Sequence, residues 1–197
     1  MIHPNTELQF INKVIGYGVV ATEFIPAGTI TWVLDKLDIE FTPEDFKKMD
    51  PLYQEIVDTY SYRNNLGNLV LCWDHGKYVN HSFNSNCLTT AYDFEIAIRD
   101  IQKGEQLTDD YGYLNIFEPF KAMEEGTKRK IVYPDDLLQY HKIWDEKLKA
   151  VFDKIPKLNQ PLQSFVQSDI WTKIGQIARG DIKMDSILTN YYDENAN

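Results

Sequence analysis

Residues 78–113 place two polar clusters at the ends of a strand–turn–strand pattern. At 94–98, apolar residues alternate with charged or small ones, which is the period of a half-buried strand. Lys103-Gly104 then supply turn chemistry before a second short extended piece at 106–108. The clusters are Asn80-His81-Ser82 before the pattern and Asp110-Tyr111-Gly112-Tyr113 after it. A chain folded this way holds both clusters at the ends of rigid strands, which suits them to position functional side chains.

The two clusters also resemble a known signature. Asn-His-Ser with Asn86, followed by Gly-Glu-x-Leu-Thr-x-Asp-Tyr-Gly-Tyr at 104–113, is similar to the motifs of the SET-domain protein lysine methyltransferases. With a glycine motif near the N-terminus, the resemblance covers residues 8–115. It implies a mostly β (α+β) SET-like fold of short strands with a pseudoknot, a small helical insert and a helical C-terminal flank.

Composition limits the other possibilities. The chain has 197 residues, 43% of them hydrophobic, enough for one domain with a core and a small flank. No apolar run approaches the about 18 residues of a membrane-spanning helix, and the first residues lack a secretory signal pattern. The net charge of −10 disfavours nucleic-acid binding, and two cysteines fit a reducing compartment rather than a disulfide framework.

Short strands and turns are expected in the first third of the chain. Candidate strands lie at 8–11, 19–24 and 30–34, with a turn at Pro26-Ala27-Gly28. Gly16-Tyr17-Gly18 is expected to be a turn, either of a hairpin or of a backbone that approaches a ligand closely. No helix start follows it, which disfavours a dinucleotide-binding motif. The resemblance assigns this backbone to the S-adenosylmethionine pocket.

Helical signals interrupt the strands at about 36–60. Thr42-Pro43-Glu44-Asp45 combines a hydroxyl cap, an N-terminal proline and first-turn acids, and Asp50-Pro51 starts a second helix. The apolar face expected to pack comprises Leu52, Tyr53, Ile56, Val57 and Tyr60. A hairpin through residues 64–68 should then connect Tyr62 to a strand at 69–73.

The helical flank is expected at 116–190, after a first domain at 1–115. A turn-rich linker should lead to a helix capped by Asp135, and a second helix should run from 162 to about 179 and stop at Gly180. The periodic apolar face of the first helix comprises Leu137, His141, Trp144, Leu148, Val151 and Ile155. Residues 191–197 are expected to form a disordered tail.

No metal site is expected. Many SET-domain relatives follow the core with a zinc-binding cysteine cluster, but here no cysteine lies beyond Cys87. The four histidines have no ligand-like spacing. Three smaller departures from the family motif are Lys77 for arginine, Phe83 for cysteine and Ser85 for proline. None of them removes a catalytic group.

The resemblance assigns roles by position. Tyr111 is the motif tyrosine whose hydroxyl points toward the transferred methyl group, and Tyr60 matches a catalytic tyrosine of the lysine channel. The implied cofactor-binding residues are Gly16, Tyr17, Gly18, Asn80, His81 and Tyr111, with Phe117 and Phe120 as covers of the pocket. The implied substrate channel comprises Tyr60, Tyr62, Asp109 and Tyr113. Tyr60 and Tyr62 have an alternative reading as plain aromatic packing.

Asp109 is the least usual of these residues. It lies two positions before Tyr111, where relatives commonly carry phenylalanine or tyrosine. An extended chain would point Asp109 into the channel, and a bulged chain would turn it to solvent.

The resemblance implies an enzyme, a protein-lysine N-methyltransferase with S-adenosylmethionine as cofactor. The alternative is a catalytically silent SET-like protein-binding module. Tyr111, Asn80 and both glycines favour the enzyme. The acidic surface favours a basic protein substrate, with no direct nucleic-acid or membrane partner. The expected location is the cytoplasm, or the nucleus for a eukaryotic source.

Overall fold

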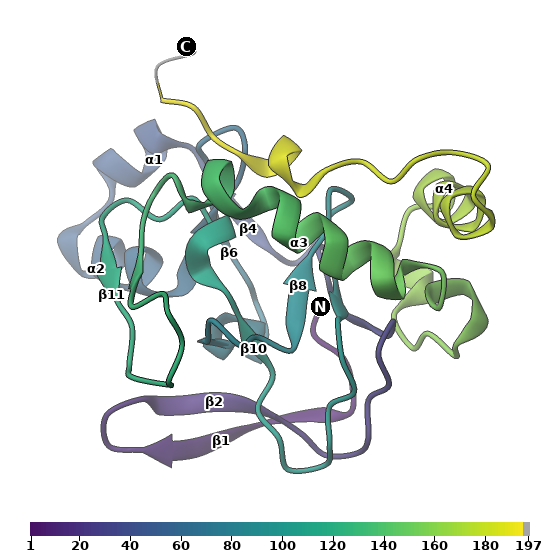
Figure 1. The fold of residues 1–197 in the computed structure, drawn as a ribbon. Helices are drawn as coiled ribbons and strands as arrows, with labels where there is room; N and C mark the ends of the chain where they lie inside the picture. Colours follow the sequence, from purple (N-terminus) through teal and green to yellow (C-terminus); the bar gives the residue numbers. More distant parts are fainter. Residues whose placement is uncertain (195–197) are drawn as a thin grey trace.

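The computed structural model describes residues 1–194, which form small sheets and four α-helices around the two motif segments (Figure 1). The strands are β1 (Thr6–Asn12), β2 (Gly16–Ala21), β3 (Ile30–Val33), β4 (Ile39–Phe41), β5 (Ser61–Arg63), β6 (Leu69–Leu71), β7 (Asn80–His81), β8 (Cys87–Thr89), β9 (Phe94–Ala97), β10 (Thr108–Asp109), β11 (Phe120–Lys121) and β12 (Ile131–Val132). The helices are α1 (Pro43–Lys48), α2 (Pro51–Tyr60), α3 (Asp136–Phe152) and α4 (Ser168–Arg179). The expected α+β class is confirmed. None of the helices in the described residues is long and apolar enough to cross a bilayer.

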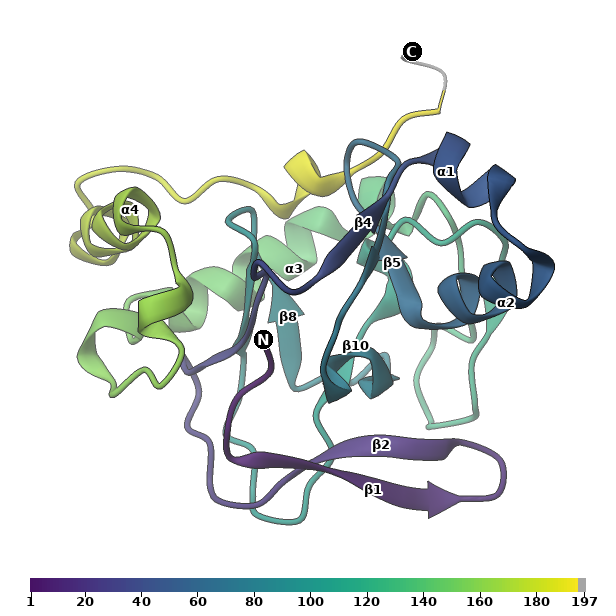
Figure 2. The ribbon, with the colours of Figure 1, turned by 180° about the vertical axis from the view of Figure 1, so that it is seen from behind.

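The strands pair in small groups. Two three-stranded antiparallel sheets have the orders β3-β9-β8 and β4-β6-β5, and β1 pairs with β2 in a hairpin. The hairpin lies at the opposite end of the molecule from the chain's C-terminal segment in both ribbon views (Figures 1 and 2). β7 and β10 form a parallel pair, so the two motif segments lie side by side. This parallel pairing of β7 and β10 is the part of the expected pseudoknot that can be seen in the strand pairing.

The glycine motif is part of a strand rather than a turn. Gly16 starts β2 with a positive φ of 81°, and Gly18 pairs within the β1–β2 hairpin. The turn itself lies just before, where the Asn12 side chain accepts hydrogen bonds from the N–H groups of Val14 and Ile15. An asparagine side chain readily substitutes for backbone in such a turn, which explains why the turn needs no glycine at its centre.

The central strand β9 is buried on both faces. The alternation at 94–98 predicted one exposed face, yet Glu95 is only 5% exposed and Ala97 is fully buried. β9 is covered because β3 and β8 flank it and residues from two hydrophobic clusters pack on it. The half-buried prediction for this strand is therefore wrong, and Glu95 is a carboxyl group inside the protein.

The helical insert forms as expected but packs loosely. Thr42 and Asp45 make a reciprocal capping box at the start of α1, and Asp50 caps α2. Of the apolar face expected on α2, only Val57 is buried. The prediction that this whole face packs is wrong, since Leu52, Tyr53 and Ile56 are 73%, 66% and 49% exposed. The β5–β6 hairpin that follows is confirmed.

The flank packs against the strands through one continuous core. Leu137, Trp144 and Leu148 of α3 belong to the same hydrophobic cluster as Phe94 and Ile96 of β9. α3 starts where predicted, but the Asp135 side chain makes no cap hydrogen bond to the backbone. The second helix starts later than predicted, at Ser168, and ends at Gly180 in a left-handed conformation as expected. The division into domains at residue 115 stays a prediction.

Gln160 links the flank to β3. Its Oε1 accepts a hydrogen bond from the Ile30 N–H at 2.8 Å, and its Nε2 donates to the Gly28 carbonyl at 2.9 Å. Gln160 is 5% exposed, so these bonds lie in the interior. They satisfy backbone groups of β3 and the preceding turn that the sheet leaves unpaired.

The start of the expected tail is ordered. The Tyr192 N–H donates to the Asn115 Oδ1 at 3.1 Å, and Glu194 forms an ion pair with the buried Arg63. The Arg63 guanidinium lies 4.3 Å from the Phe117 ring centroid and 5.0 Å from that of Tyr192. The prediction of disorder is therefore wrong for 191–194, and residues 195–197 lie outside the described part.

Candidate functional site

Backbone and side-chain hydrogen bonds fix the two motif segments against each other. Beside the β7–β10 pair, the Ser82 N–H donates to the Asp109 carbonyl at 2.8 Å. The Tyr111 N–H donates to the His81 Nδ1 at 3.1 Å. Since both contacts span the motif segments, they bring the Asn-His-Ser and Asp-Tyr-Gly residues into one site.

Tyr111 opens the 3₁₀ turn η2 (Tyr111–Tyr113), which Asp110 caps by accepting from the Gly112 N–H. The Tyr111 hydroxyl donates to the Val79 carbonyl at 2.8 Å. Burial, with a smaller effect from the charge of Asp109, raises the pKa of the Tyr111 phenol above its usual value. The phenol is therefore neutral at pH 7 and serves as a hydrogen-bond donor rather than as a base.

A cavity of about 640 Å³ lies beside Tyr111. Its volume is in the range of small-molecule and side-chain sites. All four expected channel residues line it, as do Tyr111 and both phenylalanines expected to cover the cofactor: Tyr60, Tyr62, Asp109, Tyr113, Phe117 and Phe120. Aromatic rings thus form a large part of the cavity wall, and such rings suit an alkyl chain that ends in an amine.

Two carboxyl groups, Glu95 and Asp109, lie on the buried side of this cavity. Asp109 is 8% exposed, so the alternative that turned it to solvent is wrong. Its Oδ1 accepts a hydrogen bond from the Tyr113 hydroxyl at 2.6 Å, while the Thr31 hydroxyl donates to Glu95 at 2.6 Å. Burial, and after it the nearby charge of Glu95, raise the pKa of Asp109 well above its usual value.

The expected cofactor residues Gly16, Tyr17, Gly18, Asn80 and His81 do not line the cavity. The Asn80 Nδ2 donates to the Tyr17 carbonyl at 3.0 Å and to the Gln106 Oε1 at 3.1 Å, so both amide hydrogens are used within the protein. A Cβ on Gly18 would lie 2.7 Å from the Asn80 Nδ2. Glycine is therefore needed at 18 because the strand passes directly over the Asn80 amide.

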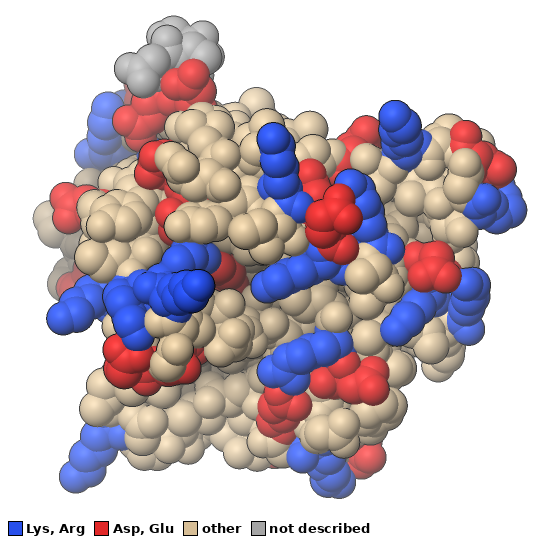
Figure 3. All heavy atoms as spheres, in the orientation of Figure 1, with Lys and Arg blue, Asp and Glu red and all other residues tan. Residues whose placement is uncertain are grey.

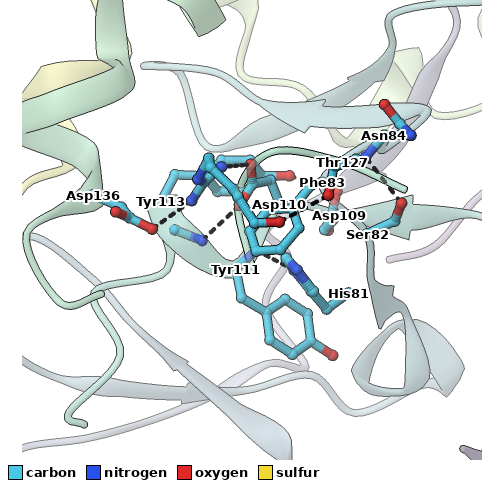
Figure 4. A network of polar contacts seen from close by, with 12 residues as sticks. His81, Ser82, Phe83, Asn84, Asp109, Asp110, Tyr111, Tyr113, Thr127 and Asp136 are labelled. Atoms are coloured by element: carbon cyan, nitrogen blue, oxygen red, sulfur yellow. Dashed lines mark hydrogen bonds and ion pairs between the residues drawn. The ribbon is translucent and has the colours of Figure 1, made fainter. Parts of the chain in front are cut away.

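The His81 ring lies beside the cavity, although His81 does not line it. The His81 ring centroid lies 5.3 Å from that of Tyr111 and 5.7 Å from that of Phe120, both of which line the cavity. Figure 4 shows the His81 and Tyr111 side chains next to each other. The rings of His81, Tyr111 and Phe120 thus lie between the expected cofactor residues and the cavity. Phe117 belongs to the cavity side, against Arg63.

The site has a polar atom that lacks a partner. Burial lowers the pKa of His81, so its ring is neutral, and because its Nδ1 accepts from Tyr111 the hydrogen sits on Nε2. That Nε2 is buried without a hydrogen-bond partner among the described residues. Beside the same half of the site, Tyr17 is 53% exposed and Phe120 is 43% exposed. A buried donor with half-exposed rings nearby fits a ligand that carries both polar groups and a flat aromatic ring, as S-adenosylmethionine does with its adenine.

The segment between β11 and β12, residues 122–130, holds both motif segments. Arg129 forms ion pairs with Asp110 of the Asp-Tyr-Gly motif and with Asp136 at the start of α3. Its guanidinium also lies 4.3 Å from the Tyr140 ring centroid. Such a planar cation can pair with two carboxylates and stack on a ring at once.

Glu125 of the same segment contacts the other motif. Its carboxylate accepts from the Ser82 hydroxyl and from the Phe83 N–H, both at 2.6 Å. The flank therefore contacts both motifs through charged side chains. The described residues contain no group of three or more His, Cys, Asp or Glu side chains that could hold a metal ion.

Sequence reasoning missed Glu95, Glu125, Arg129 and Tyr78. A charged residue inside an apolar run is a signal for Glu95, but the assumed alternation assigned it to solvent. Tyr78 lies two residues before Asn80 of the Asn-His-Ser motif. The centroid of its ring lies 5.2 Å from the centroid of the Tyr60 ring. Glu125 and Arg129 lie in a linker whose sequence carries no motif.

Charges of both signs cover the face seen in Figure 3. Basic side chains gather over the β11–β12 hairpin, whose segment includes Lys121, Lys128 and Lys130, and acidic side chains lie next to them. The net charge of −10 therefore does not appear on this face as one continuous acidic field.

Among solved structures, the chain is similar to a candidate histone methyltransferase of Plasmodium falciparum, with 20% identity and a TM-score of 0.41 over 56% of this chain and 95% of that chain. It is also similar to ctPRC2 in an autoinhibited conformation bound to S-adenosylmethionine, with 22% identity and a TM-score of 0.43 over 55% of this chain. A mutated apo form of ctPRC2 gives the same values, and in both cases the match spans 15% of the ctPRC2 chain.

No curated protein matches the chain. The model of one family, described as the SET domain, matches residues 16–112. This range begins at the glycine motif in β2, includes the Asn-His-Ser segment and ends at the glycine of Asp-Tyr-Gly. Residues 16–112 of this chain therefore form a SET domain.

Proposed function

We propose that this protein transfers a methyl group from S-adenosylmethionine to the side-chain amine of a lysine in a protein substrate. The observation that carries the proposal is the position of Tyr111, which contacts His81 on one side and lines the aromatic cavity on the other. The SET domain supports the choice of cofactor, since SET-domain methyltransferases use S-adenosylmethionine.

The chemistry requires an uncharged amine. The pKa of free lysine is about 10.4, so only about one lysine in a few thousand is neutral at pH 7. A narrow and poorly hydrated channel lowers this pKa because it disfavours the charged form. When bound, S-adenosylmethionine supplies a methyl group activated by a sulfonium. The protein then has to hold the amine in line with that group, because alignment removes much of the entropic barrier.

The chain offers residues for each of these tasks. Tyr60, Tyr62 and Phe117 provide cavity walls for the methylene groups of lysine. Tyr111 has a neutral hydroxyl at the boundary of the cavity and His81. His81 Nε2 and the backbone of Gly16 to Gly18 are the groups that would hold the cofactor.

We also propose a basic protein as the substrate and the cytoplasm as the location. The net charge of −10 supports the first proposal through electrostatic attraction. Cys72 and Cys87 are both free and buried, which fits a reducing compartment.

The experiment measures cofactor binding and methyl transfer separately. Isothermal calorimetry with S-adenosylmethionine should give saturable binding to the purified protein. Incubation with a lysate and methyl-labelled cofactor should then label lysine side chains, identified by mass spectrometry. Tyr111→Phe keeps the ring and loses the hydroxyl, so it should retain cofactor binding and lose most transfer.

Three results would count against the proposal. Absence of cofactor binding would remove the methyl donor. Cofactor binding with no labelling of any lysate protein would instead favour the catalytically silent binding module. A Tyr111→Phe variant that transfers at the wild-type rate would show that the hydroxyl does not orient the reaction.

A further inference from the structure

The wall of the cavity at residues 114–118 has no regular structure to hold it. All five of these residues line the cavity, and the segment lies after η2 and before β11. Within it, Asn115 has a positive φ of 50°, in the left-handed region that non-glycine residues occupy rarely. Phe117 contributes the aromatic ring of this wall, and its side chain is 50% exposed. The shape of the wall therefore depends on contacts from other parts of the chain.

Residues 190–194 supply two of those contacts to Asn115, and we call these residues the C-terminal strap. The Asn115 Nδ2 donates to the Asn190 carbonyl at 2.8 Å and to the Arg63 carbonyl at 3.0 Å. Its Oδ1 accepts from the Tyr192 N–H at 3.1 Å. Asn115 is 3% exposed, so these hydrogen bonds are shielded from water and together fix the left-handed residue. The strap thus holds the backbone of the wall through one side chain.

Arg63 contacts the wall and the strap at the same time. Its Nε donates to the Asn115 carbonyl at 2.8 Å, and its guanidinium forms an ion pair with Glu194. The guanidinium carbon lies 4.3 Å from the Phe117 ring centroid and 5.0 Å from that of Tyr192, distances at which a cation and an aromatic face attract each other. Arg63 is 7% exposed. The Phe117 ring is therefore tied to a buried cation that the strap also contacts.

The β5–β6 hairpin has a shape that fits the Tyr192 ring. Gly67, in the turn of that hairpin, has a φ of 80°, and a Cβ at this position would lie 2.5 Å from the Tyr192 ring. Packed atoms do not approach so closely, so a residue with a side chain at position 67 would displace the ring. The hairpin and the strap therefore hold the Tyr192 ring in one defined position beside Arg63.

We propose that Tyr192 and Glu194 are positioning residues for methyl transfer, which act through Arg63 on this wall of the cavity. The proposal rests on the proposed function, because it concerns how the same cavity holds the lysine side chain. With the strap docked, the Phe117 ring is fixed and the methylene groups of lysine bind in one orientation. With the strap released, the ring and the backbone of the wall lose their support, so the amine aligns less often with the methyl group of the cofactor.

The two cysteines give a readout that requires neither the substrate nor the cofactor. Both thiols are free, but Cys72 lines the cavity, whereas Cys87 is fully buried and does not line it. A loosened wall admits a small reagent to Cys72 alone, whereas general unfolding exposes both thiols. The measurement is the rate of alkylation by iodoacetamide, with each site identified by mass spectrometry. Burial raises the pKa of both thiols, so all variants are compared at one mildly alkaline pH.

Removal of the Tyr192 ring is the direct test. Tyr192→Ala should accelerate alkylation of Cys72 about fivefold, the factor expected from loss of one cation–π contact, and should leave the rate at Cys87 unchanged. Tyr192→Phe keeps the ring and should restore the wild-type rate. Phe165→Ala is the matched control and should behave as wild type, because Phe165 is 43% exposed at the end of η4 (Gln163–Phe165), outside the cavity lining.

A second variant and a second readout complete the test. The Glu194 side chain is 63% exposed, so Glu194→Gln leaves no buried space and should accelerate alkylation of Cys72 in the same direction, even if Tyr192→Ala does not fold. With methyl-labelled S-adenosylmethionine and lysate proteins, Tyr192→Ala should lower the rate of transfer about fivefold, and calorimetry should give the wild-type affinity for the cofactor. A wild-type protein without cofactor binding or transfer would count against the proposed function alone, because the alkylation rates measure the effect of the strap on the wall independently.

Three results would overturn the proposal. The first is a wild-type alkylation rate at Cys72 in both Tyr192→Ala and Glu194→Gln. The second is equal acceleration at Cys72 and Cys87, which would show a general loss of stability instead of a loosened wall. The third is an active wild-type protein whose rate of methyl transfer does not change in Tyr192→Ala.

Discussion

Replacement of Arg129 by methionine should destabilise the protein severely. Methionine approximates the length of the arginine stem but removes the cation that pairs with Asp110 and Asp136. Both aspartates are 2% exposed, so the variant would contain two buried carboxylates without their counter-ion. Loss of one partner of a buried ion pair costs about 3–5 kcal/mol of unfolding free energy. For a chain of this size that corresponds to a fall in Tm of about 6–20 °C.

The loss should depend on pH in a defined direction. Burial raises the pKa of Asp136, and the charge of Arg129 opposes this rise. Without Arg129 the pKa of Asp136 should rise further. A carboxyl group with a raised folded-state pKa stabilises the protein below its unfolded-state pKa, and this contribution is lost as the pH rises through the folded-state pKa. The deficit of the variant should therefore be largest near neutral pH and smallest near about pH 4.

Urea unfolding followed by circular dichroism, at both pH values, measures this difference. Arg179→Met is the matched control, since Arg179 is paired with Asp181 on the surface and its loss should change stability by less than about 0.5 kcal/mol. An Arg129→Met deficit below about 1 kcal/mol at neutral pH, or one that grows on acidification, would refute the reasoning.

Three further predictions concern the site. Asn80→Ala leaves the Tyr17 carbonyl and the Gln106 amide oxygen without this donor, which should destabilise the protein by about 1 kcal/mol and weaken cofactor binding; unchanged affinity by calorimetry would exclude this role. Chelators should affect neither Tm nor methyl transfer, and stoichiometric zinc in tag-free protein would contradict this. Because Asp109 is shorter than an aromatic ring, long incubation with excess cofactor should yield di- or trimethyl-lysine by mass spectrometry; only monomethyl-lysine from both wild type and Asp109→Tyr would show that this position does not set the number of methyl groups.

Local sequence signals predicted those parts of the fold that depend on local physics. The Thr42 cap of α1 and the helix stop at Gly180 need only nearby backbone, so both appear as expected. The two motifs also ended up adjacent, because their residues pair along β7 and β10. The cavity assignment of Tyr60 and Tyr62 came from the family resemblance rather than from periodicity.

The errors arise where distant segments decide burial. Alternation assigned Glu95 to solvent because a single strand gives no information about what covers its second face. The apolar face of α2 should have packed by its periodicity, but the sheet beside it is too small to cover Leu52. The order of residues 191–194 depends on Arg63 and Asn115, which lie 131 and 77 positions from their partners in the sequence and provide no local signal.

The hydrogen bonds of Gln160 have a consequence for synthesis on the ribosome. Gln160 is 132 residues downstream of Gly28, whose carbonyl it binds. At typical elongation rates of about 5–20 residues per second, Gln160 is synthesised roughly 7–26 s after Gly28. β3 and its preceding turn lack this hydrogen-bond partner during that interval. During that interval Ile30 and its neighbours expose apolar surface and unpaired backbone to other nascent chains. A translation product that stops soon after Tyr113 would contain every motif residue of the site and would still lack the side chain that completes β3.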